Sequence, residues 1–533
     1  MSSPAAAGVA APPEPRVDPP SRRPEPSVLL PARSRRPGHL PLGLNAAAPG
    51  TKVRGRRLSQ SDRTIAIVNY TPHTEDDVRD MLAVVGRADV DGLFDVVPPG
   101  LRAPADLGLA DGVAEADVLA ELRRLAARNR PVDEGVCFLG GGAYDHYQPA
   151  IVPAVTGRAE FATAYTPYQP EMSQGGLQAL FEFQTLVSEL LGLPIANSSL
   201  YDGATALVEG MIMCMGSTRR QRVVLAGALD PRYREILDTY ADGTGAQLAA
   251  VPPRSDGTVD PQAVAALAEG AAAVIVQHPN CVGILEDVPR LAEVAHVAGA
   301  RLLVSGDAAL SGVLEPPGRL GADVVVADGL SLGNGLHFGG PGVGLLACGV
   351  ADVRRLPGRL VGETVDIEGK RGYVLTLQAR EQHIRRDKAT SNICTNQALN
   401  ALATAVYLSW LGPQGLRELG EACLAGAAYA AEQLSAIAGV ELAHPGGVFG
   451  KEFALRLPDP VATAVALAER GYLVGPVVRL AEEDLLLVAV TEQRTRADVD
   501  GLAAVLAKVL AADPASAGVV EPAGVVEPAG VGR

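Results

Sequence analysis

The sequence predicts an α/β protein with a mainly parallel sheet in a large domain, followed by a smaller C-terminal α+β domain. From about residue 200, short apolar runs alternate with helical stretches, and these runs are VVLAG from 223, AQLAAV from 246, AAAVIVQ from 271, RLLVSGD from 301, ADVVVADG from 322 and GVGLLACG from 342. Continuous apolar runs are typical of strands that helices cover on both faces. After about residue 395 alanine-rich helical periodicity dominates, with one strand pair expected near ALRL and LLLVAV.

Length and composition are those of a soluble globular protein. The 533 residues predict two or three domains, and 47% of them are hydrophobic while 20% are charged. A net charge of −15 argues against the basic surface that nucleic-acid binding needs. Charged residues or glycine interrupt every apolar run before it reaches the roughly 20 residues that span a bilayer. We therefore expect neither nucleic acid nor membrane as a partner.

Six cysteines are spread through apolar contexts, and they are Cys137, Cys214, Cys281, Cys348, Cys394 and Cys423. No CxxC pair is present and no histidine stands at metal-ligand spacing, which disfavours a metal site. Free thiols in a reducing compartment are the expected state, so we predict a cytoplasmic protein.

The chain divides into five expected regions: a disordered basic Pro- and Arg-rich extension (1–63), an N-terminal helical region (64–135), the large α/β domain (136–395), the C-terminal α+β domain (396–512) and a disordered tail (513–533). Arginine richness in the extension also fits a transit peptide, but its prolines would break the amphipathic helix that such a peptide forms. Thr74 is expected to cap the first helix of the helical region. A doubled GVVEPAG unit marks the tail.

Ligands of a parallel sheet bind beyond the carboxyl ends of its strands, and two segments there carry candidate residues. In YDGATAL, Asp202, Gly203 and Thr205 stand at a helix start, where free backbone N–H groups can hold a phosphate. An ordinary Asp N-cap explains this motif equally well. Asp307 ends RLLVSGD and either faces a ligand or caps the following loop. In pyridoxal phosphate enzymes an acid at this place keeps the pyridine nitrogen protonated.

The glycine-rich run DGLSLGNGLHFGGPGVG follows the next strand, where a pyridoxal enzyme of this architecture would carry its Schiff-base lysine. This run contains no lysine. The five lysines of the chain are Lys52, Lys370, Lys388, Lys451 and Lys508. Because an imine requires a primary amine on the protein, we predict that no amine projects into the cleft at the sheet edge.

Aromatic residues are concentrated in one window, since eight of the 21 Phe, Tyr and Trp residues lie between residues 138 and 183. The stretch with Tyr165, Tyr168 and Gln169, and the run YDHY that contains His146, form either an internal loop or an inter-subunit surface near the functional cleft. A further segment, LTLQAREQHIRRDK, gathers basic residues around Arg380. It is either a solvated helix face or a surface for an anion or a partner.

Longer runs extend these segments, and they are YTPYQPEMSQGGLQALFEFQTLVSELLG, LGGGAYDHYQPAIVP, SSLYDGATAL, LPGRLVGETVDIEGKRGYVLTLQAREQHIRRDKATSNICTNQALNAL and FGGPG. Together they resemble the glycine cleavage P-protein family, and more narrowly the alpha subunit (subunit 1) of the two-chain glycine dehydrogenase (decarboxylating). The resemblance covers about Thr64 to Ala512. The chain departs from the family pattern near His337 and Gly342, which affects the detail of this loop only.

The resemblance implies an aspartate-aminotransferase-like fold, which is fold type I of the pyridoxal-phosphate-dependent transferases. In that family the second subunit carries the cofactor lysine, so this chain is expected to bind no cofactor covalently. Counting back from Gly-Gly-Pro without a gap, Leu330 stands at the missing-lysine position. The candidate residues Asp202, Gly203, Thr205 and Asp307 would then be remnants of a cofactor cup.

The resemblance also implies the reaction and its partners. With a homologous beta subunit that carries pyridoxal phosphate, the chain would decarboxylate glycine and pass the aminomethyl group to the lipoyl arm of H-protein, and it would be inactive alone. Tyr165, Tyr168, Gln169 and His146 are the candidates for lining the partner's site. Two alternatives stay open: a stand-alone enzyme of the same fold, and a structural or regulatory homologue without activity.

Overall fold

The computed structural model of the chain describes residues 73–102, 108, 112–480 and 482–512. Both regions expected to be disordered, 1–63 and 513–533, lie outside the described residues, as do residues 64–72 of the expected helical region. The chain divides into two compact units, residues 1–112 and 113–533.

In the first unit the described residues form one α-helix, α1 (Glu75–Val84), and two 3-10 helices, η2 (Asp91–Phe94) and η3 (Pro99–Leu101). The prediction that Thr74 caps a helix is confirmed. The Thr74 hydroxyl accepts from the Asp77 N–H at 3.2 Å, and the Asp77 carboxylate accepts from the Thr74 N–H at 2.7 Å. This reciprocal capping box satisfies two N–H groups that a helix start would otherwise leave unpaired.

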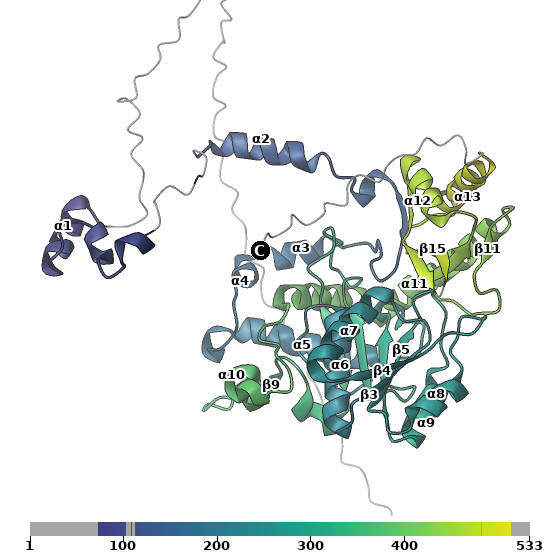
Figure 1. Cartoon of the computed structure of the whole chain (residues 1–533), viewed down its shortest axis with the longest axis horizontal. Coiled ribbons are helices and arrows are strands. Elements are labelled where there is room, and N and C mark those ends of the chain that lie inside the picture. The colour runs from purple at the N-terminus through teal and green to yellow at the C-terminus, as the bar shows by residue number, and fades with distance from the viewer. Residues whose placement is uncertain (1–72, 103–107, 109–111, 481, 513–533) are drawn as a thin grey trace, which may run out of the picture. The chain divides into compact units, whose positions relative to one another are not determined.

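A seven-stranded sheet forms the centre of the second unit (Figure 1). In sheet order its strands are β2 (Ile195–Ala196), β8 (Gly344–Cys348), β7 (Val324–Asp328), β6 (Arg301–Gly306), β5 (Ala273–His278), β3 (Arg222–Ala226) and β4 (Gln247–Val251). The pairings from β4 through β7 are parallel, whereas β8 runs antiparallel to both β7 and β2. All six strands expected from the apolar runs are present, and the mainly parallel sheet is confirmed.

Helices cover both faces of this sheet, which explains the continuous apolar runs. The covering helices are α5 (Gln174–Leu191), α6 (Gly203–Thr218), α7 (Pro231–Thr244), α8 (Pro261–Ala268), α9 (Val288–Val297) and α11 (Ala398–Ser435). Val224 packs in one core cluster with α5, α8, α9 and α11, while its neighbour Val223 packs in another with α6 and α7. Both valines are fully buried, so neither face of the strand meets solvent.

The smaller sheet has four antiparallel strands, ordered β11 (Glu441–Leu442), β12 (Glu452–Arg456), β15 (Glu483–Ala489) and β14 (Val477–Leu480). The strand pair expected near ALRL and LLLVAV is therefore confirmed as β12 with β15. Helices α12 (Pro460–Glu469) and α13 (Arg496–Ala511) share its core. Strand β1 (Val136–Leu139) opens the range expected for the large domain, yet it pairs in parallel with β13 (Tyr472–Gly475) beside the smaller sheet.

Short elements complete the second unit: α2 (Glu115–Ala126), η4 (Val132–Glu134), α3 (Ile151–Thr156), α4 (Ala159–Ala162), η5 (Pro170–Met172), η6 (Ala308–Leu310), η7 (Val350–Arg355), β9 (Val361–Val365), β10 (Arg371–Leu375), η8 (Gln378–Arg380), α10 (Gln382–Arg385) and η9 (Arg386–Lys388). Strands β9 and β10 form an antiparallel hairpin. Within the part of the chain that the structure describes, no helix has both the length and the apolar composition to cross a membrane.

Candidate functional site

A small cavity lies where β5, β6 and β7 end and the smaller sheet begins. Its wall consists of Gly142, Tyr144, Asp230, Tyr233, Gln277, Pro279, Asn280, Gly283, Ser305, Gly306, Asp307, Leu310, Asp328, Ser331, Lys451 and Glu452. The space that a water molecule can enter is about 60 Å³, enough for a few waters. The carboxyl ends of the parallel strands therefore meet at this cavity, as the fold requires of a ligand site.

Asp307 and Lys451 form a buried ion pair in this cavity. The Asp307 Oδ1 atom accepts from the Ala309 N–H at 3.0 Å and caps η6, while Oδ2 lies 2.8 Å from Lys451 Nζ. The Lys451 side chain is only 1% exposed. The prediction that no amine projects into the cleft is therefore wrong. The turn before β12 packs against the end of β6, with Gly450 against Leu310, and it brings in a lysine that lies far away in the sequence.

Lys451 also joins this ion pair to His146. Its Nζ atom lies 3.1 Å from His146 Nε2 and 3.8 Å from the centroid of the Tyr144 ring. His146 Nδ1 lies 2.7 Å from Glu492 Oε2. Burial, followed by the positive charge of Lys451, lowers the pKa of His146. A neutral imidazole satisfies both contacts, because Nε2 accepts from the ammonium while Nδ1–H donates to Glu492.

The start of α6 is closed by two carboxylates. Asp202 is the N-cap, and its Oδ1 accepts from the Thr205 N–H at 2.7 Å. The Gly203 N–H donates to Asp328 Oδ2 at 2.8 Å, and the Leu330 N–H donates to Asp328 Oδ1 at 2.7 Å. Of the two interpretations open for this motif, the structure thus contains the Asp N-cap. Two N–H groups at this helix start, those of Gly203 and Thr205, are thus held by the chain's own acids.

Asp328 is a partly buried acid with two backbone donors. Burial raises the pKa of Asp328 to about 6, against the lowering effect of the Gly203 and Leu330 N–H groups. The backbone of Gly203 comes very close to this carboxyl: a Cβ atom there would lie 2.9 Å from the Asp328 Cβ and would also meet the Tyr233 hydroxyl. Only glycine allows this approach.

Leu330, the residue expected at the missing-lysine position, is absent from the cavity wall. Its neighbour Ser331, which is 8% exposed, belongs to the wall. Neither an isobutyl group nor a serine hydroxyl can form an imine.

Glu452 follows Lys451 and faces the same cavity. Its Oε1 accepts from the Gly141 N–H at 2.6 Å, and its Oε2 accepts from the Tyr144 hydroxyl at 3.1 Å. Burial is the main reason why the pKa of Glu452 is raised to about 7. Glu452 thus ties the loop after β1 to the edge of β12.

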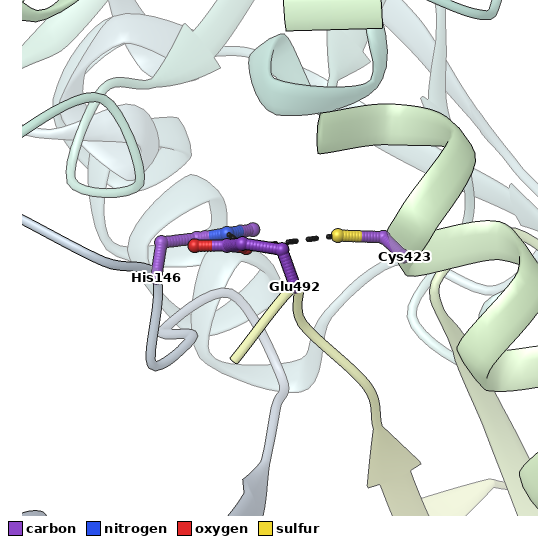
Figure 2. A group of neighbouring side chains, drawn as sticks. All are labelled: His146, Cys423 and Glu492. Carbon is purple, nitrogen blue, oxygen red and sulfur yellow. Dashed lines mark hydrogen bonds and ion pairs between the residues drawn. The ribbon is translucent and has the colours of Figure 1, made fainter. Parts of the chain in front are cut away.

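His146, Cys423 and Glu492 converge from a loop, a helix and the segment after β15 (Figure 2). Their potential ligand atoms all lie within 4.8 Å of one another, and Cys423 Sγ is 3.9 Å from Glu492 Oε2. Burial raises the pKa of the Cys423 thiol to about 12, whereas zinc binds the thiolate. The Lys451 ammonium against His146 also opposes a second cation. We interpret the group as a hydrogen-bonded cluster that contacts Lys451 through His146.

The other predicted site residues lie on the surface. Tyr165 is 87% exposed, Tyr168 is 54% exposed, and Gln169 is also exposed. The Tyr168 ring rests against a buried cation, with Arg359 Cζ 5.7 Å from its centroid, and it meets the His383 ring edge-on at 6.2 Å. The structure therefore separates the four candidates: the first three share an exposed segment, whereas the side chain of His146 is 4% exposed.

The basic segment around Arg380 is not a uniform solvated face. Arg380 is half-buried, and its Nη1 donates to the carbonyl oxygens of Leu356 and Gly358. Glu381 is 6% exposed. Residues 382–388 of the segment, including Arg385, are exposed.

The cavity does not fit pyridoxal phosphate. A protonated pyridine nitrogen would need the Asp307 oxygen that Lys451 occupies, and a phosphate would need the Gly203 N–H that Asp328 occupies. No amine stands at the Leu330–Ser331 step, and the remaining space holds only a few waters. The chain's own side chains therefore hold the polar groups of this cavity that the cofactor would need.

Three of the decisive residues were missed in the sequence: Lys451, Asp328 and Glu452. For Asp328 a signal was available, because an acid follows the apolar run in VVVADG as it does in RLLVSGD. For Lys451, the signal is the run GKEFALRL, in which two charged residues directly enter an apolar strand. Such charges are buried only when they have partners.

The sheet order, the antiparallel β8 and the acid after β6 define the class of fold type I pyridoxal-phosphate-dependent enzymes. Solved structures share this fold at low identity: sphingosine-1-phosphate lyase of Burkholderia pseudomallei (TM-score 0.58, 16% identity, 77% of this chain and 92% of that one) and glutamate decarboxylase of Lactobacillus brevis (TM-score 0.59, 14% identity, 77% and 95%). Within this class the chain belongs to the glycine cleavage system P-protein family, which matches residues 68–506.

Relatives at higher identity narrow the assignment. The chain is 46% identical to glycine dehydrogenase (decarboxylating) subunit 1 of Carboxydothermus hydrogenoformans, over 82% of this chain and 99% of the relative. It is 48% identical to the protein of the same name from Nitratidesulfovibrio vulgaris, over 83% and 100%. The crystal structure of an inhibitor-bound glycine decarboxylase (P-protein) of the glycine cleavage system matches with a TM-score of 0.78 at 48% identity, covering 83% of this chain and 100% of that one. The expected family and its role in glycine dehydrogenase are thus confirmed.

Proposed function

We propose that this chain is the subunit of glycine dehydrogenase (decarboxylating) that binds no cofactor. A homologous beta subunit would carry pyridoxal phosphate, decarboxylate glycine and transfer the aminomethyl group to the lipoyl arm of H-protein. One observation carries the proposal: in the cavity, Lys451 forms an ion pair with Asp307, and the position of Ser331 offers no amine for an imine. The subunit-1 name of the relatives supports a two-chain assembly.

The contribution of this chain would be to wall the partner's site and to exclude water from it. Tyr165, Tyr168 and Gln169 are the surface we assign to this contact, since large exposed rings give contact area at small entropy cost. Arg359, which is 3% exposed, supports the Tyr168 ring from behind. His146 would act only indirectly, because its side chain is buried against Lys451.

The cysteines support a reducing compartment, and we propose the cytoplasm. All six are free thiols, and five of them are buried. Burial raises the pKa of Cys281 to about 12, which keeps this thiol protonated and unreactive at neutral pH.

Reconstitution tests the function directly. The purified chain, the purified beta subunit and an equimolar mixture would each be given carboxyl-labelled glycine and lipoylated H-protein, and release of labelled carbon dioxide would be measured. We expect release only from the mixture. Release by the chain alone would establish the stand-alone enzyme instead, and an inactive mixture made with an active-site-competent beta subunit would establish a structural or regulatory homologue.

A further inference from the structure

We propose that two side chains of this chain take the places of the two charged groups of the cofactor: Lys451 that of the protonated pyridine ring, and Asp328 that of the phosphate. Because these side chains already hold the partners that the cofactor would need, the cavity rejects pyridoxal phosphate. The inference deepens the proposed assignment of the cofactor to the partner subunit and rests on it. It assigns a role to two residues: they ensure that only one of two homologous subunits is loaded.

Lys451 takes the place of the protonated pyridine ring as the cation that pairs with Asp307. Asp307 has one oxygen committed to the Ala309 N–H, so Oδ2 is the oxygen that remains for a cation, and Lys451 Nζ lies 2.8 Å from it. The ammonium is held in addition by His146 Nε2 and by the face of the Tyr144 ring. A ligand would have to displace a cation that already has three partners and almost no exposure to water.

Asp328 takes the place of the phosphate as the anion that accepts from the start of α6. Helix starts attract anions because their first N–H groups have no partner within the helix. Here the Asp328 carboxylate accepts from the Gly203 N–H at 2.8 Å, at the start of a sixteen-residue helix. An entering phosphate would lose this donor and would also face the negative charges of Asp328 and Asp202.

The charge balance of the whole cavity points in the same direction. Four acids stand in its wall, namely Asp230, Asp307, Asp328 and Glu452, against the single lysine. Arg232 neutralises the first of them. The lining therefore disfavours an anionic ligand, and its own carboxylates take the hydrogen bonds that such a ligand would use.

Pyridoxine 5′-phosphate is the probe of choice, because it has the pyridine ring and the phosphate but no aldehyde and so cannot form imines with surface lysines. Binding at about pH 8 would be measured by calorimetry for the wild-type chain, Lys451→Ala, Asp328→Ala and the double variant. The control is Lys508→Ala with Asp242→Ala, two exposed residues. We expect no saturable binding by the wild type or the control, and binding by the double variant at least about tenfold tighter than the wild-type limit.

Two results would overturn the inference: saturable binding by the wild type equal to that of the double variant, or a folded double variant that binds no better. If the double variant does not fold, Lys451→Ala alone provides the test. Ethylammonium chloride should raise its melting temperature relative to sodium chloride and leave the wild type unchanged, because a small amine can re-enter the emptied cation position. Equal effects on both proteins reject the inference. Failure of the proposed function would instead appear as an inactive wild-type mixture with the beta subunit.

Discussion

Lys451 Nζ lies 2.8 Å from Asp307 Oδ2 and joins the turn before β12 to the end of β6. Replacement of Lys451 by Met keeps the length of the side chain but leaves the Asp307 carboxylate, which is 16% exposed, without its counter-ion. We expect the free energy of unfolding to fall by about 3 kcal/mol, the low end for a broken buried pair. Urea denaturation measures this loss. Lys508→Met, at an exposed site on α13, should stay within about 0.5 kcal/mol of the wild type, and equal effects of both variants would contradict the prediction.

Glu452 should make stability depend on pH. Burial is the main reason why the pKa of Glu452 rises from 4.5 to about 7, so between these values the folded chain holds a proton that the unfolded chain has released. The stabilisation from this group is complete below pH 4.5 and is lost as the pH rises through about 7. The full loss is on the order of 3 kcal/mol, since one pKa unit corresponds to about 1.4 kcal/mol.

The variant Glu452→Gln isolates this effect because an amide does not titrate and still accepts from the Gly141 N–H. Asp328 and Glu209 change stability in the same direction, while His278, with a pKa lowered to about 4, acts in the opposite one. The measured quantity is therefore the difference between variant and wild type across the pH range. It should grow in favour of the variant as the pH rises, and Glu469→Gln, on an exposed face of α12, should show no such trend.

Two glycines of α6 should respond oppositely to alanine. At Gly203 a Cβ atom would approach Asp328 Cβ to 2.9 Å and would meet the Tyr233 hydroxyl, whereas at Gly216 no atom lies within 4 Å. We expect Gly203→Ala to destabilise the chain by about 1–3 kcal/mol through overpacking. Gly216→Ala should stabilise it by about 0.5–1 kcal/mol, because alanine loses less backbone entropy in a helix. Thermal denaturation distinguishes them, and a neutral Gly203→Ala would mean that α6 does not start this close to β7.

Tyr165 should matter for assembly and not for folding. Its side chain is 87% exposed, so Tyr165→Ala should leave the melting temperature unchanged. Association with the beta subunit should weaken by about 1–2 kcal/mol, or roughly tenfold in Kd, because an interface aromatic is lost. Titration calorimetry gives the Kd. Tyr165→Phe keeps the ring and should stay within about threefold of the wild type.

A matched control for this surface is Val297→Ala, a residue on α9 that is 90% exposed. It should leave the Kd for the beta subunit unchanged. The assignment of the Tyr165 segment to the contact fails if both alanine variants bind the partner as the wild type does.

Much of the fold could be predicted because its signals are local. The apolar runs of β3 to β8 are long and unbroken, and capping of α1 by Thr74 depends on residues only three positions apart. The long runs that resemble the P-protein family additionally predicted the family and its fold. The pairing of β1 with β13 could not be foreseen, because the two strands are distant in sequence and either could have joined another sheet edge.

The sequence by itself determined the large parallel sheet, the smaller C-terminal sheet, the acid at the end of β6 and the lack of a lysine in the glycine-rich run. Only the tertiary structure decided which side chains hold the polar groups of the cavity. Lys451 reaches Asp307 because the turn before β12 packs on the end of β6, and Asp328 reaches Gly203 because β7 ends beside α6. Charges that must be buried find their partners through space, and sequence spacing does not record those distances.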